Sequence, residues 1–313
     1  MAPAFDLLVL GDVNPDLVLR GGDVVPAFGQ AEHLVDEAAL TVGGSGAIMA
    51  CAAARLGMRV VLCGVVGGDL FGRFVCDELE RRDVDARGIV TAPDRPTGVT
   101  VVLSGVQDRA ILTMPGTIAE LRADLIDRSL LDEARHVHVS SYFLQRGLQA
   151  DLPGVFERVH EAGGSTSIDP NWDPTEAWDG GLLHVLEMTD VFFPNAVEAT
   201  RVAHISDVGE AISRLAAHGG LVVVKRGDLG ATAGSRNERA TVAGRPVPVV
   251  DTTGAGDSFD AGFLAAWLAG EPLERALAIA NTFGALSTSA TGGVNGQVSW
   301  DEAVAALEED PAG

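Results

Sequence analysis

The stretch FDLLVLG, Phe5 to Gly11, is a short apolar run that ends in glycine. Such a run predicts a buried strand that leads into a loop. Similar runs recur at 60–64, 136–140, 165–169, 191–193 and 221–225. Helical patterns occur between them at 45–56, 71–81, 152–162 and 208–218. This alternation predicts an α/β fold, a doubly wound, mainly parallel sheet between helices, whose ligand crevice lies beyond the carboxyl ends of the strands.

Two segments interrupt the alternation, because they are strand-like and contain no helical pattern. We expect residues 16–41 and 97–117 to form a small β-sheet that covers the substrate site as a lid. The remaining residues, 1–15, 42–96 and 118–313, then form one α/β nucleotide-binding and catalytic domain. After Asp251 this domain becomes helical, at 255–269, 272–289 and 301–307.

The composition predicts a cytoplasmic protein. The 313 residues are 47% hydrophobic, enough for a sizeable core, yet no apolar run has the length of a membrane span or the features of a signal peptide. The three cysteines lack metal-type spacing and are interpreted as reduced core thiols. With 44 acidic against 22 basic residues and a net charge of −22, nucleic acid and anionic membranes are poor partners. A nucleoside triphosphate must therefore be held by Mg²⁺, backbone amides and helix N-termini.

The segment DTTGAGDSFDAGF, Asp251 to Phe263, predicts an anion site at the start of a helix. Gly254 and Gly256 flank Ala255, so the amides of residues 253–256 can converge on one anion without side-chain obstruction. Asp257 would accept a hydroxyl proton while these amides stabilise a transferring phosphoryl group. A low-pKa carboxylate suffices, because a loose transition state needs positioning more than a strong base. By itself, the pattern also fits a helix cap with a tight turn.

Five segments, in order along the chain, resemble signatures of the ribokinase-like (PfkB) carbohydrate kinase family. They are GGSGAIMACAAARLG (43–57), VVGGDLFG (65–72), NAVE (195–198), VVVKRGDLGA (222–231) and DTTGAGDSFDAGF (251–263). The resemblance covers nearly the whole chain. It implies an ATP-dependent carbohydrate kinase, a Mg²⁺-requiring transferase that phosphorylates a hydroxyl group of a small sugar or sugar acid. It also implies a homodimer formed through the lid.

The resemblance distributes the candidate site residues among four groups. The reaction centre comprises Asp257 with Gly254, Ala255 and Gly256. The acceptor substrate is expected at Asn14, Asp16, Gly43, Gly44, Ser45, Ile48, Arg109 and Asn171. The nucleotide is expected at Asn195, Lys225, Gly227, Gly230 and Asn281. Glu198 is expected to hold Mg²⁺ through water, and Asp251 and Thr253 are expected beside a monovalent cation such as K⁺.

Four of these residues also have a structural interpretation. Lys225, the only lysine in the chain, could be a solvated surface side chain. Arg109 could be an exposed charge that protects a sheet edge. Asn281 could satisfy a neighbouring backbone group, and Asp251 could cap a turn.

The acceptor pocket departs from the family pattern. Ser45 and Ile48 stand where ribokinases carry lysine and asparagine, which makes ribose a doubtful substrate. Asn14 and Asp16, in the loop after the first strand, could hold vicinal hydroxyls or simply form a turn. The only aromatic residue of both lid segments is Phe28, which favours a small sugar or sugar acid over a nucleoside.

The strand at 165–169 leads into a polar segment that should face the crevice. Any of Asp169, Asn171 and Asp173 could point into it. Two alternatives stay open, a nucleoside kinase of the same fold and a non-catalytic sugar-binding regulator. Asp257, its anion site and the NxxE motif argue against the regulator, since binding alone requires no base. A dinucleotide-dependent oxidoreductase is disfavoured, because the first strand leads into GDVNPD rather than GxGxxG.

Overall fold

The computed structural model describes residues 3–21, 24–26, 28–105 and 109–309. Within these ranges, nine strands form one large sheet in the order β13-β12-β11-β10-β9-β8-β1-β4-β5. Their bounds are β1 Phe5–Leu10, β4 Val60–Gly67, β5 Asp85–Ala92, β8 Ala134–Val139, β9 Ser165–Ile168, β10 Val191–Phe192, β11 Leu221–Lys225, β12 Ala231–Gly234 and β13 Arg239–Val242. The sheet is parallel except at one edge, where β12 pairs antiparallel with β11 and β13 pairs antiparallel with β12. The predicted doubly wound, mainly parallel sheet is confirmed.

Helices cover both faces of this sheet, because its buried strands carry apolar side chains on both sides. In β1, Leu7 and Val9 belong to one core and Leu8 and Leu10 to the other. The first core includes residues of α1 (Ser45–Arg55), α2 (Leu70–Glu80), α9 (Ala255–Ala269), α10 (Leu273–Ser287) and α11 (Trp300–Glu309). The second includes residues of α3 (Arg128–Glu133), α4 (Arg146–Gln149), α5 (Leu152–Glu161), α6 (Leu182–Leu186), α7 (Ala196–Ala203) and α8 (Val208–Leu215).

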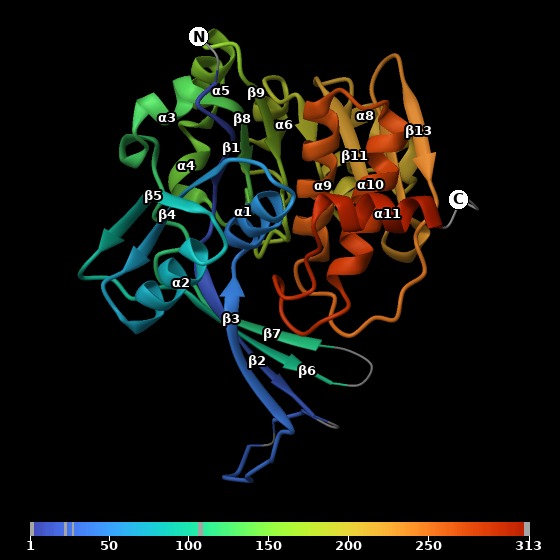
Figure 1. Cartoon of the computed structure of the whole chain (residues 1–313). Helices are drawn as coiled ribbons and strands as arrows, with labels where there is room; N and C mark the ends of the chain where they lie inside the picture. The colour runs from blue at the N-terminus through green and yellow to red at the C-terminus, as the bar shows by residue number, and fades with distance from the viewer. Residues whose placement is uncertain (1–2, 22–23, 27, 106–108, 310–313) are drawn as a thin grey trace.

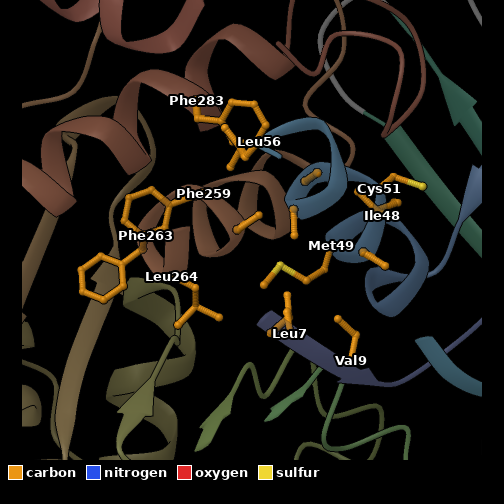
Figure 2. Packing of buried hydrophobic residues seen from close by; sticks show 14 of the residues in the cluster. Leu7, Val9, Ile48, Met49, Cys51, Leu56, Phe259, Phe263, Leu264 and Phe283 are labelled. Carbon is orange, nitrogen blue, oxygen red and sulfur yellow. The ribbon is translucent and has the colours of Figure 1, made fainter. Parts of the chain in front are cut away.

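The packing of α1 against α9 positions the functional site. In Figure 2, Met49 of α1 lies above Leu7 and Val9 of β1, with Leu264 and then Phe263 of α9 to its left in the same cluster. All five side chains are fully buried. Since the glycine signature opens α1 and the DTTGAGD segment opens α9, this contact brings together two motifs that lie some 200 positions apart in the sequence.

A second, smaller sheet stands beside the large one (Figure 1). Its strands run in the order β3-β2-β6-β7, with bounds β2 Asn14–Arg20, β3 Glu37–Gly43, β6 Val99–Ser104 and β7 Arg109–Met114. Both segments that interrupt the strand–helix alternation supply these strands. One expectation was wrong in detail: Asn14 and Asp16 lie in β2 and not in a loop, because β2 pairs with β3 from its first residue.

None of the helices in the described ranges is long and apolar enough to cross a membrane.

Candidate active site

Two cavities of similar size meet at the N-terminus of α9. The first, which we call the acceptor cavity, measures about 770 Å³ and includes Asn14, Asp16, Ser45, Asn171 and Asp257 in its wall. The second, the nucleotide cavity, measures about 700 Å³ and includes Gly230, Arg245 and Asn281. Lys225, Gly227, Thr252 and Gly256 line both cavities. A group bound in one cavity can therefore meet a group bound in the other at these four residues.

Gly254 allows the chain to enter α9 at this junction. It is the N-cap of the helix and has a φ of 72°. A Cβ at this position would lie 2.8 Å from Gly293 O and 2.8 Å from the Ile48 Cγ2 of α1. Only glycine satisfies both the left-handed backbone and the close packing. Ile48, expected to contact the acceptor, therefore both lines the acceptor cavity and supports this turn.

Fewer backbone amides are free at the start of α9 than the sequence predicts. The amide of Thr253 donates to Asp251 Oδ1 at 2.9 Å, and that of Ala255 donates to Thr252 O at 3.3 Å. Among the described residues, the amides of Gly254 and Gly256 meet no protein acceptor. The prediction that the four amides of residues 253–256 all point at one anion was therefore wrong, because two of them donate hydrogen bonds within the turn itself. Two free donors remain at a helix N-terminus, the arrangement that binds anions.

Asp257 follows these amides in the first turn of α9 and lines the acceptor cavity. Burial, with the negative charge of Asp169 nearby, raises its pKa to about 8. The charge of Lys225 and a hydrogen bond with Ser45 oppose this rise. The sequence-based interpretation of Asp257 as a low-pKa carboxylate was wrong, because it could not account for desolvation and the acidic neighbour. A carboxylate with this pKa is a stronger base once ionised.

Part of the wall of the acceptor cavity is formed by β2, which packs against the end of β3. Asn14 and Asp16 are both nearly inaccessible, and Asn14 Nδ2 donates to Asp16 Oδ1 at 3.3 Å and to Thr100 Oγ1 at 3.4 Å. A Cβ on Gly43 would lie 1.9 Å from Asp16 Oδ1, so the glycine signature makes room for this carboxylate. The pair offers donors and acceptors to a polyhydroxylated ligand.

Asp12, which sequence reasoning did not assign to the site, fixes the start of α1. Its carboxylate accepts from the amides of Ser45 at 3.1 Å and Gly46 at 3.0 Å. The N-cap Gly44 has no side chain for this task, and a Cβ there would lie 2.8 Å from Asp12 O. Burial raises the pKa of Asp12. The signal in the sequence was an acidic residue directly after a strand that ends in glycine.

Asn171 links the segment after β9 to α1. Its Nδ2 donates to Ser45 Oγ at 3.0 Å and to Ser141 Oγ at 3.1 Å. Because Ser45 also hydrogen-bonds Asp257, a short polar chain leads from Asn171 to the predicted base. Trp172 lines the same cavity and keeps 46% of its surface exposed.

Asp169 also faces the acceptor cavity, as expected, but Asp173 does not. The carboxylate of Asp173 accepts from the amides of Thr175 at 2.9 Å and Trp178 at 2.7 Å, so it holds the following turn. Arg109 contributes its backbone to β7, but its side chain lies outside the described residues.

The NxxE pair forms a complete capping box at α7. Asn195 Oδ1 accepts from the amides of Val197 and Glu198, and Glu198 Oε2 accepts from the Asn195 amide at 2.8 Å. Both residues line the acceptor cavity. Burial and the charge of Asp169 raise the pKa of Glu198 to about 7. Each Glu198 oxygen already accepts one hydrogen bond from Asn195, which leaves a lone pair on each for a metal-bound water.

Lys225 is not a solvated surface residue, so that alternative was wrong. Its side chain is 13% exposed, and Nζ lies 2.7 Å from Asp169 Oδ2 and 3.0 Å from Asp260 Oδ2. Burial alone would lower the pKa of Lys225, but the charges of Asp169 and Asp260 outweigh it and raise that pKa. Asp260 was not a predicted site residue, since its position in the interior of α9 carries no signal of a partner on β11.

The nucleotide cavity lies between the turn after β11 and α10. Gly230 has a φ of 88°, and a Cβ there would lie 2.1 Å from Val242 O, so glycine is required. Asn281 lines this cavity and also donates to Ala243 O at 3.2 Å, which fits both interpretations of this residue. Arg245 was not predicted. It lines the cavity and, within the described ranges, takes part in none of the ion pairs.

Asp251, expected beside a monovalent cation, lies next to the anion site. It is 8% exposed, accepts from Thr253 Oγ1 at 2.7 Å, and accepts from the Gly292 amide at 2.8 Å. The carboxylate therefore ties the start of the DTTGAGD segment to a glycine-rich loop, whether or not a cation binds beside it.

Comparison with known proteins identifies the family. The model described as pfkB family carbohydrate kinase matches residues 4–300. The fructokinase of Salmonella typhimurium is 32% identical over 265 residues, which is 80% of this chain and 86% of that protein. The ATP-dependent ribose-1-phosphate kinase of Halopiger xanaduensis is 32% identical over 288 residues, 91% of this chain and 93% of that protein. Among solved structures, an E. coli protein assigned as ribokinase II, in complex with ATP and Mg²⁺, aligns with a TM-score of 0.85 at 28% identity and covers 97% of this chain and 99% of that chain. The chain belongs to the pfkB family of carbohydrate kinases.

Proposed function

We propose that this kinase transfers the γ-phosphoryl group of ATP to a hydroxyl group of an uncharged sugar. The observation that carries the proposal is the junction of the two cavities at α9, where Gly256 lines both and Asp257 lines the acceptor cavity. Phosphoryl transfer requires donor and acceptor to meet in line at a point that stabilises negative charge. The free amides of Gly254 and Gly256 supply that stabilisation.

In this mechanism Asp257 takes the proton of the acceptor hydroxyl as the new oxygen–phosphorus bond forms and the bond between the γ-phosphorus and the bridging β,γ oxygen breaks. Ser45 orients the carboxylate by its hydrogen bond and is itself held by Asn171. The Gly254 and Gly256 amides donate to the oxygens of the group in transit. Asp257, Ser45, Asn171, Gly254 and Gly256 all line the acceptor cavity, so each of these roles belongs to a residue beside the acceptor.

The residues around Glu198 fit a magnesium ion bound through water. When bound there, Mg²⁺ would neutralise negative charge on the phosphates. Across the described residues, no group of three acidic, histidine or cysteine side chains could hold a metal ion on its own. This donor set suits an ion coordinated mainly by phosphates and water, with Glu198 hydrogen-bonded to that water.

The acceptor cavity favours a neutral ligand over a sugar acid or sugar phosphate. Of the described side chains in its wall, Lys225 is the only cation, and two carboxylates already hold it. Asn14 and Asp16 offer hydrogen bonds to hydroxyls, and Trp172 presents an exposed ring. A carboxylate or phosphate on the substrate would face Asp12, Asp16 and Asp169 without an available counter-charge.

An ATP-consumption screen tests the acceptor. Hexoses, pentoses, sugar acids, sugar phosphates and nucleosides are each supplied with Mg-ATP, and NMR spectroscopy identifies the hydroxyl that becomes phosphorylated. We expect the highest kcat/KM with an uncharged sugar. A preference for an acid or a phosphate that disappears in an Arg109→Ala variant would overturn the neutral-acceptor proposal and identify Arg109 as the counter-charge. Preference for a nucleoside would favour the nucleoside kinase.

Arg245 gives a prediction for the nucleotide side. Because this guanidinium lines the nucleotide cavity and has no ion pair within the described ranges, we expect it to meet the polyphosphate or ribose. A hydrogen bond to a charged group contributes about 1.5–3 kcal/mol, so Arg245→Ala should raise the KM for ATP about 10- to 100-fold and change kcat less. Arg226→Ala is the matched control, since Arg226 lines neither cavity. Equal KM values for both variants would contradict the prediction.

We also propose that a monovalent cation binds beside Asp251 and orders the α9 turn. Asp251 and the Gly292 loop lie directly against the anion site, so a cation there would rigidify the amides of Gly254 and Gly256. Added K⁺ should therefore raise kcat severalfold above the rate in buffer that contains only a bulky organic cation. Equal rates in the two buffers would count against the cation site.

The small sheet is proposed to cover the acceptor and to join two copies of the chain. In β7, Ile111 and Thr113 line the acceptor cavity, whereas Leu112 and Met114 alternate with them and stay 60% and 43% exposed. Alternation along the strand gives the sheet one face toward the cavity and one apolar outer face. Light scattering should report a dimer that Leu112→Glu converts to a monomer.

A further inference from the structure

The cluster of Lys225, Asp169 and Asp260 has no assigned role in the proposed mechanism. All three side chains are nearly inaccessible, at 13%, 9% and 1% exposure. Nζ donates to Asp169 Oδ2 at 2.7 Å and to Asp260 Oδ1 and Oδ2 at 3.1 and 3.0 Å. An ammonium group has three donors, and here they all point at carboxylate oxygens of these two residues.

The composition of the chain singles out this position. Of its 22 Lys and Arg residues, Lys225 is the only lysine. The packing explains why arginine does not replace it here. A Cβ on Gly256 would lie 3.7 Å from Lys225 Nζ and 3.9 Å from its Cδ and Cε, so the backbone of α9 runs directly against the lysine stem. The broad planar guanidinium of arginine would press on the Gly254–Gly256 turn, whereas a compact ammonium fits.

The three residues come from three elements that carry the proposed chemistry. Lys225 ends β11, Asp169 follows β9, and Asp260 lies in α9 three positions after Asp257. Asp169 Oδ1 also accepts from the Asn171 amide at 2.8 Å. The lysine therefore joins the helix that presents the base to the segment that orients the acceptor.

The same cluster influences the charge of the base. Burial raises the pKa of Asp257, Asp169 raises it further, and Lys225 lowers it. The other titratable groups around Asp257 and this cluster are Asp12 after β1, Asp16 in β2, Glu198 at the start of α7 and His138 in β8. Burial lowers the pKa of His138 to about 3, so this imidazole stays neutral, and Lys225 is the only cation of the group.

We propose that Lys225 is a positioning residue for phosphoryl transfer, whose ion pairs with Asp169 and Asp260 hold the α9 turn and Asp257 in register with the acceptor segment. This inference rests on the proposed kinase function. It assigns Lys225 a role through other residues, in place of the direct nucleotide contact expected from the sequence. Loss of the lysine therefore affects the transfer step and the acceptor more than ATP binding.

The test measures kcat, both KM values and the pH dependence of kcat/KM for Lys225→Met and Asp169→Asn, with circular dichroism as the check on folding. A displacement of about 1 Å at a reacting group can cost about 10²-fold, so we expect a loss of that order in kcat for Lys225→Met, with KM for ATP nearly unchanged. The fall of kcat/KM at low pH, which reports protonation of Asp257, should move to higher pH in Lys225→Met and to lower pH in Asp169→Asn. A purely structural role would not shift the two profiles in opposite directions.

Two outcomes overturn the inference. Wild-type kcat and pH profile in folded Lys225→Met would remove the positioning role, and a rise confined to the KM for ATP would return Lys225 to the nucleotide site. If Lys225→Met does not fold, Asp260→Asn keeps the shape of the cluster and removes one ion pair. It should then lower kcat without raising the KM for ATP, and wild-type kinetics in that variant would also overturn the inference. Failure of the kinase proposal is separate, because it would appear as no sugar phosphorylation by the wild-type chain.

Discussion

Replacing Asp257 with asparagine should lower kcat by about 10²- to 10⁴-fold, the usual contribution of a positioned general base. Asparagine keeps the shape of the side chain but cannot accept the proton of the acceptor hydroxyl. The KM for ATP should change little, because Asp257 lines the acceptor cavity and not the nucleotide cavity. Steady-state kinetics with the best acceptor from the screen provide the measurement, and near wild-type turnover would contradict the mechanism.

The same substitution should stabilise the folded chain in a pH-dependent manner. The pKa of Asp257 rises from the ordinary value of 3.8 to about 8 on folding, so the folded state favours the protonated carboxyl. The contribution of this protonation to the free energy of unfolding of the wild type is therefore lost as the pH rises from about 4 toward 8. The neutral Asp257→Asn side chain escapes this loss. Thermal melting should show an advantage of the variant that is small at pH 5 and large at pH 8.5; an advantage independent of pH would refute the raised pKa.

Gly256→Ala should have the second largest effect on turnover. The new methyl group would lie 3.7 Å or more from its nearest neighbours, the atoms of the Lys225 side chain, so the fold accommodates it. It would also stand between the two cavities, beside the amide that donates to the phosphoryl group in the proposed mechanism. Alanine keeps the backbone N–H, but its methyl group would keep a phosphoryl oxygen from reaching that N–H. Loss of one oxyanion donor costs about 10²- to 10³-fold in other enzymes, and we expect a decrease in kcat of that order.

Gly154→Ala is the matched control for this experiment. Gly154 lies in α5 and lines neither cavity, and a Cβ there meets nothing within 4 Å. Each substitution replaces a helical glycine by alanine, which stabilises a helix by about 0.5–1 kcal/mol. We expect both variants to melt at or above the wild-type temperature, while only Gly256→Ala loses activity. Equal activities would show that the junction tolerates a methyl group and would contradict the proposed path of the phosphoryl group.

Most of the fold and the centre of the site were predictable because their causes are local. Apolar runs that end in glycine predict strands such as β1, and the DTTGAGD segment predicts a helix start that the structure has at Ala255. Three strands of the large sheet were not predicted: β5, β12 and β13. β5 is an edge strand with no fully buried residue, so it forms no apolar run. β12 and β13 span only four residues each. These two segments form strands because β12 pairs with the edge of β11 and β13 then pairs with β12.

The class of fold, the family and the segment at the junction can be predicted from residue order, since each depends on patterns within short stretches of chain. Which side chains meet across elements depends on the tertiary structure. It buries the single lysine between Asp169 and Asp260, uses Asp12 to cap α1, and brings Asp169 close enough to raise the pKa of Asp257. Charge interactions and desolvation act through space, and no spacing along the chain encodes the distances on which they depend.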